Sequence, residues 1–141
     1  MTAVHAGLLS IDPAPIGDLL DCFGIDGARE AVVRLSDGVE RKLRDIEAAV
    51  SGRAASSLRR PAHDLASLAG SLGLLALECA ARDIERACDA GDEASALAVA
   101  TSLSPLVEGV PSTVAAAFVD AVRGRLPSAT AASGRHWGGA A

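Results

Sequence analysis

The sequence predicts an all-α protein, an antiparallel up-and-down four-helix bundle with a short helix before it. Half of its 141 residues are hydrophobic but only 2% are aromatic, so the core has to be built from Ala, Leu, Val and Ile at helical spacing. Apolar residues recur every three or four positions along four long segments. Turns containing Gly52, Gly73 and Gly91 separate these segments, and short connections of this kind favour antiparallel neighbours.

The chain is expected to begin with a flexible stretch over residues 1–10. Asp12 is a favourable N-cap and Pro13 is tolerated at the first helical position, so a short helix should open there and end at Gly24. A helix of this length is not stable alone. We therefore expect it to lie across the bundle as a lid.

The strongest periodicity lies in the second segment, from residue 27 to 50, for which Asp26 is the expected N-cap. Its opposite face is rich in charged residues, which indicates a solvated surface. The apolar seam sustained over this helix consists of Val32, Leu35, Val39, Leu43, Ile46 and Val50.

Three further helical segments follow, over residues 55–72, 74–90 and 92–122. Asp92 is the expected N-cap of the last of them. Pro105 and Pro111 each remove an internal hydrogen bond, so they predict a kink or a break within it. No periodicity survives after it, so the bundle should cover residues 11–125 and residues 126–141 should form a disordered tail.

Charge and composition exclude several classes of function. The formal net charge is −5 at pH 7 and tyrosine is absent, which disfavours a nucleic-acid partner. The N-terminal apolar stretch is too short and too polar for a signal or membrane-spanning segment, so we expect a cytoplasmic protein without a membrane partner. The three cysteines, Cys22, Cys79 and Cys88, form neither a disulfide framework nor a zinc motif, and we interpret them as buried reduced thiols.

His63 is the candidate functional residue. At about 100° per residue, the large apolar side chains of its helix point in one direction and His63 points about 160° away from them. The imidazole should therefore face water, with Ala66, Ser67 and Gly70 leaving a shallow bare patch around it. Histidine is largely neutral and nucleophilic near neutral pH. Such a ring can be reached by another protein and can carry a phosphoryl group.

The residues around His63 form a spaced pattern that continues into the next helix. It resembles the histidine-containing phosphotransfer (HPt) domains of bacterial multistep phosphorelays, over about residues 11–125. The opening Ile11-Asp12 and Phe23-Gly24-Ile25-Asp26 are also similar to that family. The stretches that carry the resemblance are Ala62-His63-x-Leu65, Ala69-Gly70-x-Leu72-Gly73 and Leu77-x-Cys79-Ala80-x-x-x-Ile84-Glu85.

The resemblance implies that His63 accepts a phosphoryl group from a receiver-domain aspartate and passes it to another receiver. The family usually has lysine three residues after the histidine and glycine four after, where this chain has Ala66 and Ser67. Cations from elsewhere could replace the missing lysine. The residues expected to support the phosphoryl group are Arg59, Arg60, Ser67 and Arg82, and those expected to form the docking surface are Ala66 and Gly70.

Our leading hypothesis is a monomeric phosphocarrier that uses no cofactor and lacks its own kinase or ATP site, because the chain has no glycine-rich phosphate loop. Mg²⁺ is then expected on the partner receiver and not on this chain, where no metal ligand set is expected. The alternative is a binding module of the same fold that regulates a receiver or kinase by docking. A third reading, an enzyme with His63 as general base, is disfavoured because no partner carboxylate lies one helical turn away on that face.

Overall fold

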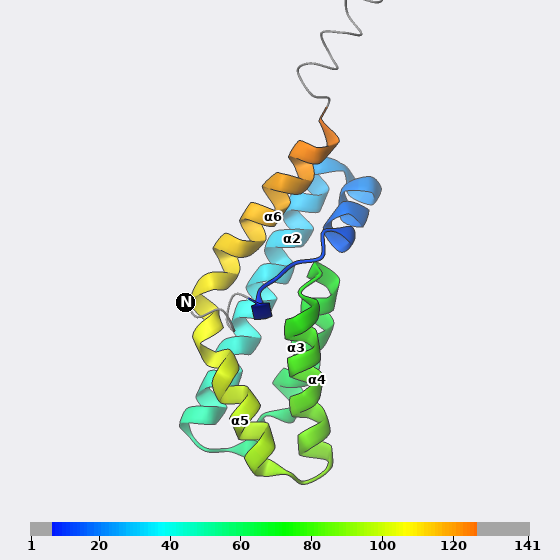
Figure 1. Ribbon diagram of the computed structural model, residues 1–141. Helices are drawn as coiled ribbons and strands as arrows, with labels where there is room; N and C mark the ends of the chain where they lie inside the picture. Colours follow the sequence, from blue (N-terminus) through cyan, green and yellow to red (C-terminus); the bar gives the residue numbers. More distant parts are fainter. Residues whose placement is uncertain (1–6, 127–141) are drawn as a thin grey trace, which may run out of the picture.

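The computed structural model describes residues 7–126, and every regular element in that range is helical (Figure 1). This confirms the all-α class predicted from the sequence. Two short 3₁₀ segments join α-helices at places where the chain turns or bends. The elements are α2 (Ala14–Ser51), η1 (Ala55–Ser57), α3 (Arg59–Leu72), α4 (Leu75–Asp89), α5 (Glu93–Leu103), η2 (Ser104–Gly109) and α6 (Val110–Arg125).

Successive helices run in alternating directions along one long axis, with α5 and α6 together forming the last column (Figure 1). The predicted break between Pro105 and Pro111 is confirmed, because η2 separates α5 from α6 there. The predicted N-cap of α5 is also confirmed: the Asp92 carboxylate accepts a hydrogen bond from the Ser95 amide at 3.1 Å. Hydrogen bonds from the Ser95 hydroxyl and amide hold the pKa of Asp92 below its ordinary value.

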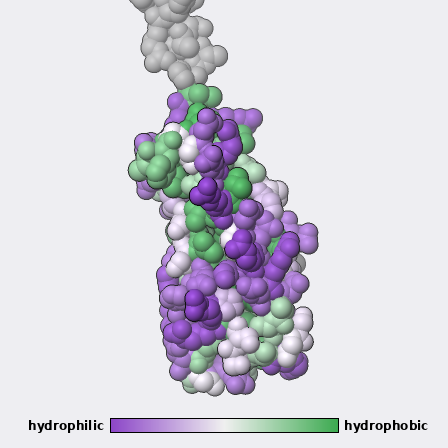
Figure 2. All heavy atoms as spheres, turned by 180° about the vertical axis from the view of Figure 1, so that it is seen from behind, coloured by the Kyte–Doolittle hydropathy of each residue, from purple (hydrophilic) through white to green (hydrophobic). Residues whose placement is uncertain are grey.

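The core is aliphatic and lies between the columns. The seam predicted for α2 is confirmed, since four of its residues are buried and Leu35 and Val50 pack partly buried against the core. Hydrophilic side chains extend over much of one long face of the bundle in Figure 2, with hydrophobic ones gathered near its upper end. The largest fully buried side chains are Ile16, Val39, Leu43, Ile46, Leu58, Leu65, Leu72, Leu74, Leu77, Ile84, Leu103 and Leu106.

The predicted end of the N-terminal helix at Gly24 is confirmed, since α2 consists of two helical parts on either side of this residue. Gly24 has non-helical angles, φ 71° and ψ −178°, and sets off residues 14–23 from the rest of the helix by a kink. Asp26, expected to cap a separate helix, instead pairs with Arg29 at 3.0 Å. The second helical part of α2 therefore begins directly after Gly24, and the Asp26 side chain does not cap it.

The ends of the chain are described only in part. Of the stretch expected to be flexible, residues 7–10 are described, and Leu9 is 3% exposed within the core. Residues 1–6 lie outside the described residues. The tail expected over residues 126–141 lies outside them as well, except for Leu126.

The first part of α2 and the residue Asp12 before it each contact another part of the fold. A guanidinium nitrogen of Arg125, at the end of α6, donates to the Gly17 carbonyl and to the Asp21 carboxylate, both at 2.8 Å. The Asp12 amide donates to the carbonyl of Gly73 at 2.9 Å, in the turn between α3 and α4. The start of the chain therefore braces the turn that connects these two helices.

The cysteines differ from the expectation of buried thiols. Cys22 and Cys79 are exposed, because both lie on outward faces of their helices, and only Cys88 is partly buried. Burial raises the pKa of the Cys88 thiol above its ordinary value.

Among the described residues, Glu93–Arg125 is the one stretch long and apolar enough to cross a membrane by length and composition. In the fold this stretch is α5, η2 and α6, and side chains such as Leu103, Leu106 and Phe118 are buried in the bundle. Its apolar character follows from its many alanines and few charges, and a helix that contributes to a core has the same composition.

Replacing Gly73 should destabilise the fold. Gly73 has φ 84°, and a Cβ added there would lie 2.2 Å from the Asp12 carbonyl oxygen. We expect Gly73→Ala to lower the free energy of unfolding by clearly more than the about 1–2 kcal/mol that a left-handed alanine costs. Denaturant unfolding measures this loss.

Gly91→Ala is the matched control. Gly91 has φ 73°, but a Cβ there would meet nothing within 4 Å. The free energy of unfolding of Gly91→Ala should fall only by the cost of placing alanine in a left-handed backbone conformation. Equal losses in the two variants would mean that the contact with Asp12 does not constrain the α3–α4 turn.

Candidate functional site

His63 lies in the second turn of α3, and its side chain is 54% exposed. The helix takes this orientation because its apolar residues face inward toward both neighbouring helices. The buried residues of α3 are Ala62, Leu65, Ala66, Ala69 and Leu72.

The imidazole is held by a carboxylate from the next helix. His63 Nδ1 lies 2.8 Å from Glu85 Oε2, and the Glu85 side chain is only 15% exposed. An ionised carboxylate can only accept a hydrogen bond, so Nδ1 carries the ring proton. The other ring nitrogen, Nε2, is then left with a free lone pair.

Sequence reasoning missed the role of Glu85. Helical spacing identifies neighbours of His63 only on its own helix, whereas the carboxylate comes from α4. The available signal was the tight turn at Gly73, since residues at similar distances before and after such a turn face each other in antiparallel helices. His63 and Glu85 have that relation.

Arg59 lies one turn before His63 and joins the same network. Its Nε lies 2.6 Å from Asp89 Oδ1, and a terminal nitrogen lies 3.6 Å from Glu85 Oε2. The hydrogen bond to Asp89 and the charge of Asp89 raise the pKa of Arg59 above its ordinary value. A permanent cation therefore lies beside the carboxylate that holds the imidazole.

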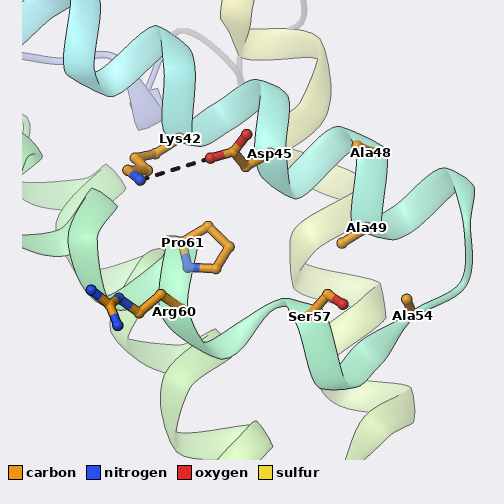
Figure 3. Close-up of a pocket in the computed structure, with 8 residues that line it drawn as sticks. All are labelled: Lys42, Asp45, Ala48, Ala49, Ala54, Ser57, Arg60 and Pro61. Atoms are coloured by element: carbon orange, nitrogen blue, oxygen red, sulfur yellow. Dashed lines mark ion pairs between the residues drawn. The ribbon is translucent and has the colours of Figure 1, made fainter.

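Arg60 lies on the other side of α3, toward α2. Its side chain is 90% exposed and its Nε is 3.8 Å from Asp64 Oδ2, which also pairs with Lys42 at 3.4 Å. Figure 3 shows Arg60 at the edge of a cleft between α2 and α3, with Pro61 beside it and Lys42 and Asp45 across the cleft. Arg60 therefore contacts an aspartate of α3 and not the acids of α4.

The contacts between α3 and α4 define one antiparallel register. Arg59 meets Asp89, His63 meets Glu85, and a Cβ placed on Gly70 would lie 3.0 Å from Glu78 Oε1. In this register Arg82 of α4 is level with Ala66.

The patch expected to be bare is partly covered. The Glu78 carboxylate lies over Gly70, which is half-buried as a result. Arg82 pairs with the same Glu78 carboxylate at 3.1 Å. Ser67 is exposed, and its carbonyl accepts a hydrogen bond from the Ser71 hydroxyl at 3.0 Å.

The expected exposure of Ala66 is wrong, since Ala66 is 0% exposed. The large residues Leu58, Leu65 and Leu72 define only one part of the buried arc. Because α3 packs most extensively against α4, the arc extends to the alanine side of the helix. Ala66 therefore belongs to the helix interface and cannot touch a docked partner.

The site thus combines a half-exposed imidazole, a carboxylate that fixes the tautomer, and arginines from two helices. Within residues 7–126, no group of three His, Cys, Asp or Glu side chains is placed to hold a metal ion. The fold and the site together define a helical bundle that carries a half-exposed histidine on its surface, held by a carboxylate of the next helix.

The comparison with protein families agrees with this description. Residues 30–124 match the family model of the Hpt domain, which is well over half of the chain. The protein therefore belongs to the Hpt domain family, whose members carry phosphoryl groups on histidine in phosphorelays and are not kinases. Neither the curated proteins nor the solved structures gave a significant match.

The tautomer of His63 is a direct test of this geometry. When the ring is neutral, ¹⁵N NMR should show the proton on Nδ1 and a bare Nε2, because Glu85 accepts from Nδ1. Glu85→Leu removes the acceptor and should shift the population toward the Nε2–H form. Glu85→Gln keeps an acceptor oxygen and should retain more of the Nδ1–H form than the leucine variant. A wild-type ring protonated mainly on Nε2 would contradict the contact.

Proposed function

We propose that this chain is a phosphorelay histidine phosphotransfer protein in which His63 accepts a phosphoryl group from a receiver-domain aspartate and passes it to another receiver. The observation that carries the proposal is the hydrogen bond of His63 Nδ1 with Glu85 at 2.8 Å. It leaves Nε2 unprotonated on a side chain that is 54% exposed.

The transfer step follows from this tautomer. The Nε2 lone pair attacks the phosphorus of the aspartyl phosphate, and the bond between phosphorus and the aspartate oxygen breaks, with its electron pair returning to the carboxylate. The ring becomes a phosphorylated imidazolium whose Nδ1 proton remains shared with Glu85. The carboxylate offsets the positive charge that develops on the ring. Return of the group to a second receiver reverses these changes.

The phosphoryl group brings nearly two negative charges, so nearby cations favour it. Arg59 is one turn away and already within 3.6 Å of Glu85. Arg82 is level with Ala66, so a cation from α4 is available on that side although the family lysine is missing from α3. Arg60 and Ser67 are exposed and lie one turn before and one turn after His63, within reach of a docked partner.

The receiver supplies the acidic pocket and its Mg²⁺, and a separate kinase feeds the relay. This chain acts without a cofactor of its own, as a cytoplasmic monomer. Its docking surface is the exposed side of α3 around His63, including Ser67 and the partly covered Gly70. Ala66 supports this surface from below without contacting the partner.

The test is transfer from a phosphorylated receiver to the purified chain. The labelled phosphoryl group should appear on the wild type and be absent from His63→Gln. A control variant without the other two histidines, His5→Gln with His136→Gln, should still be labelled. Because the ring is more than half exposed, His63→Gln should change the free energy of unfolding by no more than about 1 kcal/mol.

The binding-module alternative gives a different result in the same assay. A receiver that binds the wild type firmly but never labels it would support docking without transfer and contradict our proposal. Label retained in His63→Gln would place the acceptor elsewhere.

A further inference from the structure

We propose that Glu78 is a positioning residue that latches Arg82 away from His63 until His63 carries a phosphoryl group. The inference rests on the proposed function and deepens it. It assigns a role to an ion pair on α4 that no part of the transfer chemistry requires. Glu78 touches no reacting atom in this proposal and acts only through the guanidinium.

The geometry of the pair shows where the guanidinium is held. A terminal nitrogen of Arg82 lies 3.1 Å from Glu78 Oε2, with side chains 45% and 26% exposed. Glu78 lies one turn before Arg82 on α4, at the level of Gly70, while Glu85 and His63 lie almost a turn beyond Arg82 in the other direction. The ion pair therefore draws the guanidinium along the helix, away from the imidazole.

The missing side chain of Gly70 provides the space for this arrangement. A Cβ on Gly70 would come within 3.0 to 3.2 Å of three atoms of the Glu78 carboxylate group. The carboxylate thus rests on the glycine backbone, where any larger residue would displace it. Gly70 has a role within the chain as well as on the docking surface.

The other acids near His63 are already engaged. Glu85 is shared by the His63 ring and Arg59, and Asp89 is taken by Arg59. Among the described residues, Arg82 forms an ion pair with Glu78 alone. Arg82 is thus held by one weak ion pair, since exposed pairs at this spacing stabilise a helix only slightly.

Phosphorylation changes the balance between the two anions. The phosphoryl group on Nε2 carries nearly two negative charges and three acceptor oxygens, whereas Glu78 offers one charge. Arg82 can therefore leave Glu78 for the phosphoryl group, in an exchange of ion pairs without any covalent change. Glu78 competes with the phosphoryl group for the Arg82 guanidinium. It therefore reduces the stabilisation that Arg82 gives to the phosphoryl group on His63.

The experiment loads His63 with phosphoramidate, which transfers its phosphoryl group to Nε2 and releases ammonia without a receiver. The apparent pKa of the bound phosphoryl group is then followed by ³¹P NMR as the pH is varied. A neighbouring cation lowers that pKa because it favours the dianion. We expect Glu78→Gln to lower it by about 0.2 to 0.7, as removal of one exposed competing ion pair should.

The Arg82→Gln background separates the latch from a simple charge effect. Glu78→Gln removes a negative charge, and the loss of this charge by itself lowers the phosphoryl pKa whether or not Arg82 is present. The effect of the latch requires Arg82, so the Glu78→Gln shift should shrink markedly when Arg82→Gln is already present. Asp83→Asn is the matched control, because it removes an acid from another ion pair on α4, with Arg86, and should leave the phosphoryl pKa unchanged.

A second readout follows Arg82 itself. Its Nε–H resonance should move when the wild type is phosphorylated. Gly70→Ala pushes the Glu78 carboxylate aside, so it should shift the phosphoryl pKa in the same direction as Glu78→Gln.

The outcomes distinguish the latch from the proposed function. If Glu78→Gln has no effect, or the same effect with and without Arg82, the latch is refuted while phosphotransfer stands. If phosphoramidate labels His63 but no receiver does, the proposed function fails and the latch is still measured. If phosphoramidate labels no His63 at all, the accessible nucleophile is absent and both proposals fall.

Discussion

The close antiparallel packing of α3 against α4 is the constraint on which the site depends. Small residues such as Ala62 and Ala66 on α3 and Ala81 on α4 are fully buried, so the helices approach closely. This packing fixes the register that sets Glu85 against His63 and Asp89 against Arg59. The turn at Gly73, braced by the Asp12 amide, holds the helix ends together and keeps that register.

The same register gives the site its chemistry. One carboxylate orients the half-exposed ring and accepts the hydrogen bond of Nδ1, so the neutral ring has an unprotonated Nε2. The arginines come from both helices, and each is already paired with an acid of α4 or α3. The site is therefore a network of weak, exposed ion pairs that a new anion can rearrange.

Much of the fold could be predicted from the sequence because helical periodicity and turn residues are local signals. The seam of α2, the cap at Asp92 and the break between Pro105 and Pro111 each depend on residues within a few positions of one another. The end of the N-terminal helix at Gly24 was predicted in the same way, and the backbone is non-helical at that residue. What the sequence did not specify is how the next helix begins, because Asp26, the expected cap, pairs with Arg29 instead.

The sequence by itself determined that the chain forms helices with an aliphatic core and that His63 stands apart from the large apolar residues, because side-chain direction along a helix follows from position alone. Only the tertiary structure decided which neighbours His63 has. The partner Glu85, the burial of Ala66 and the cover of Glu78 over Gly70 arise between two helices. These contacts depend on how one helix is rotated and shifted against another, and no spacing within a single helix specifies that.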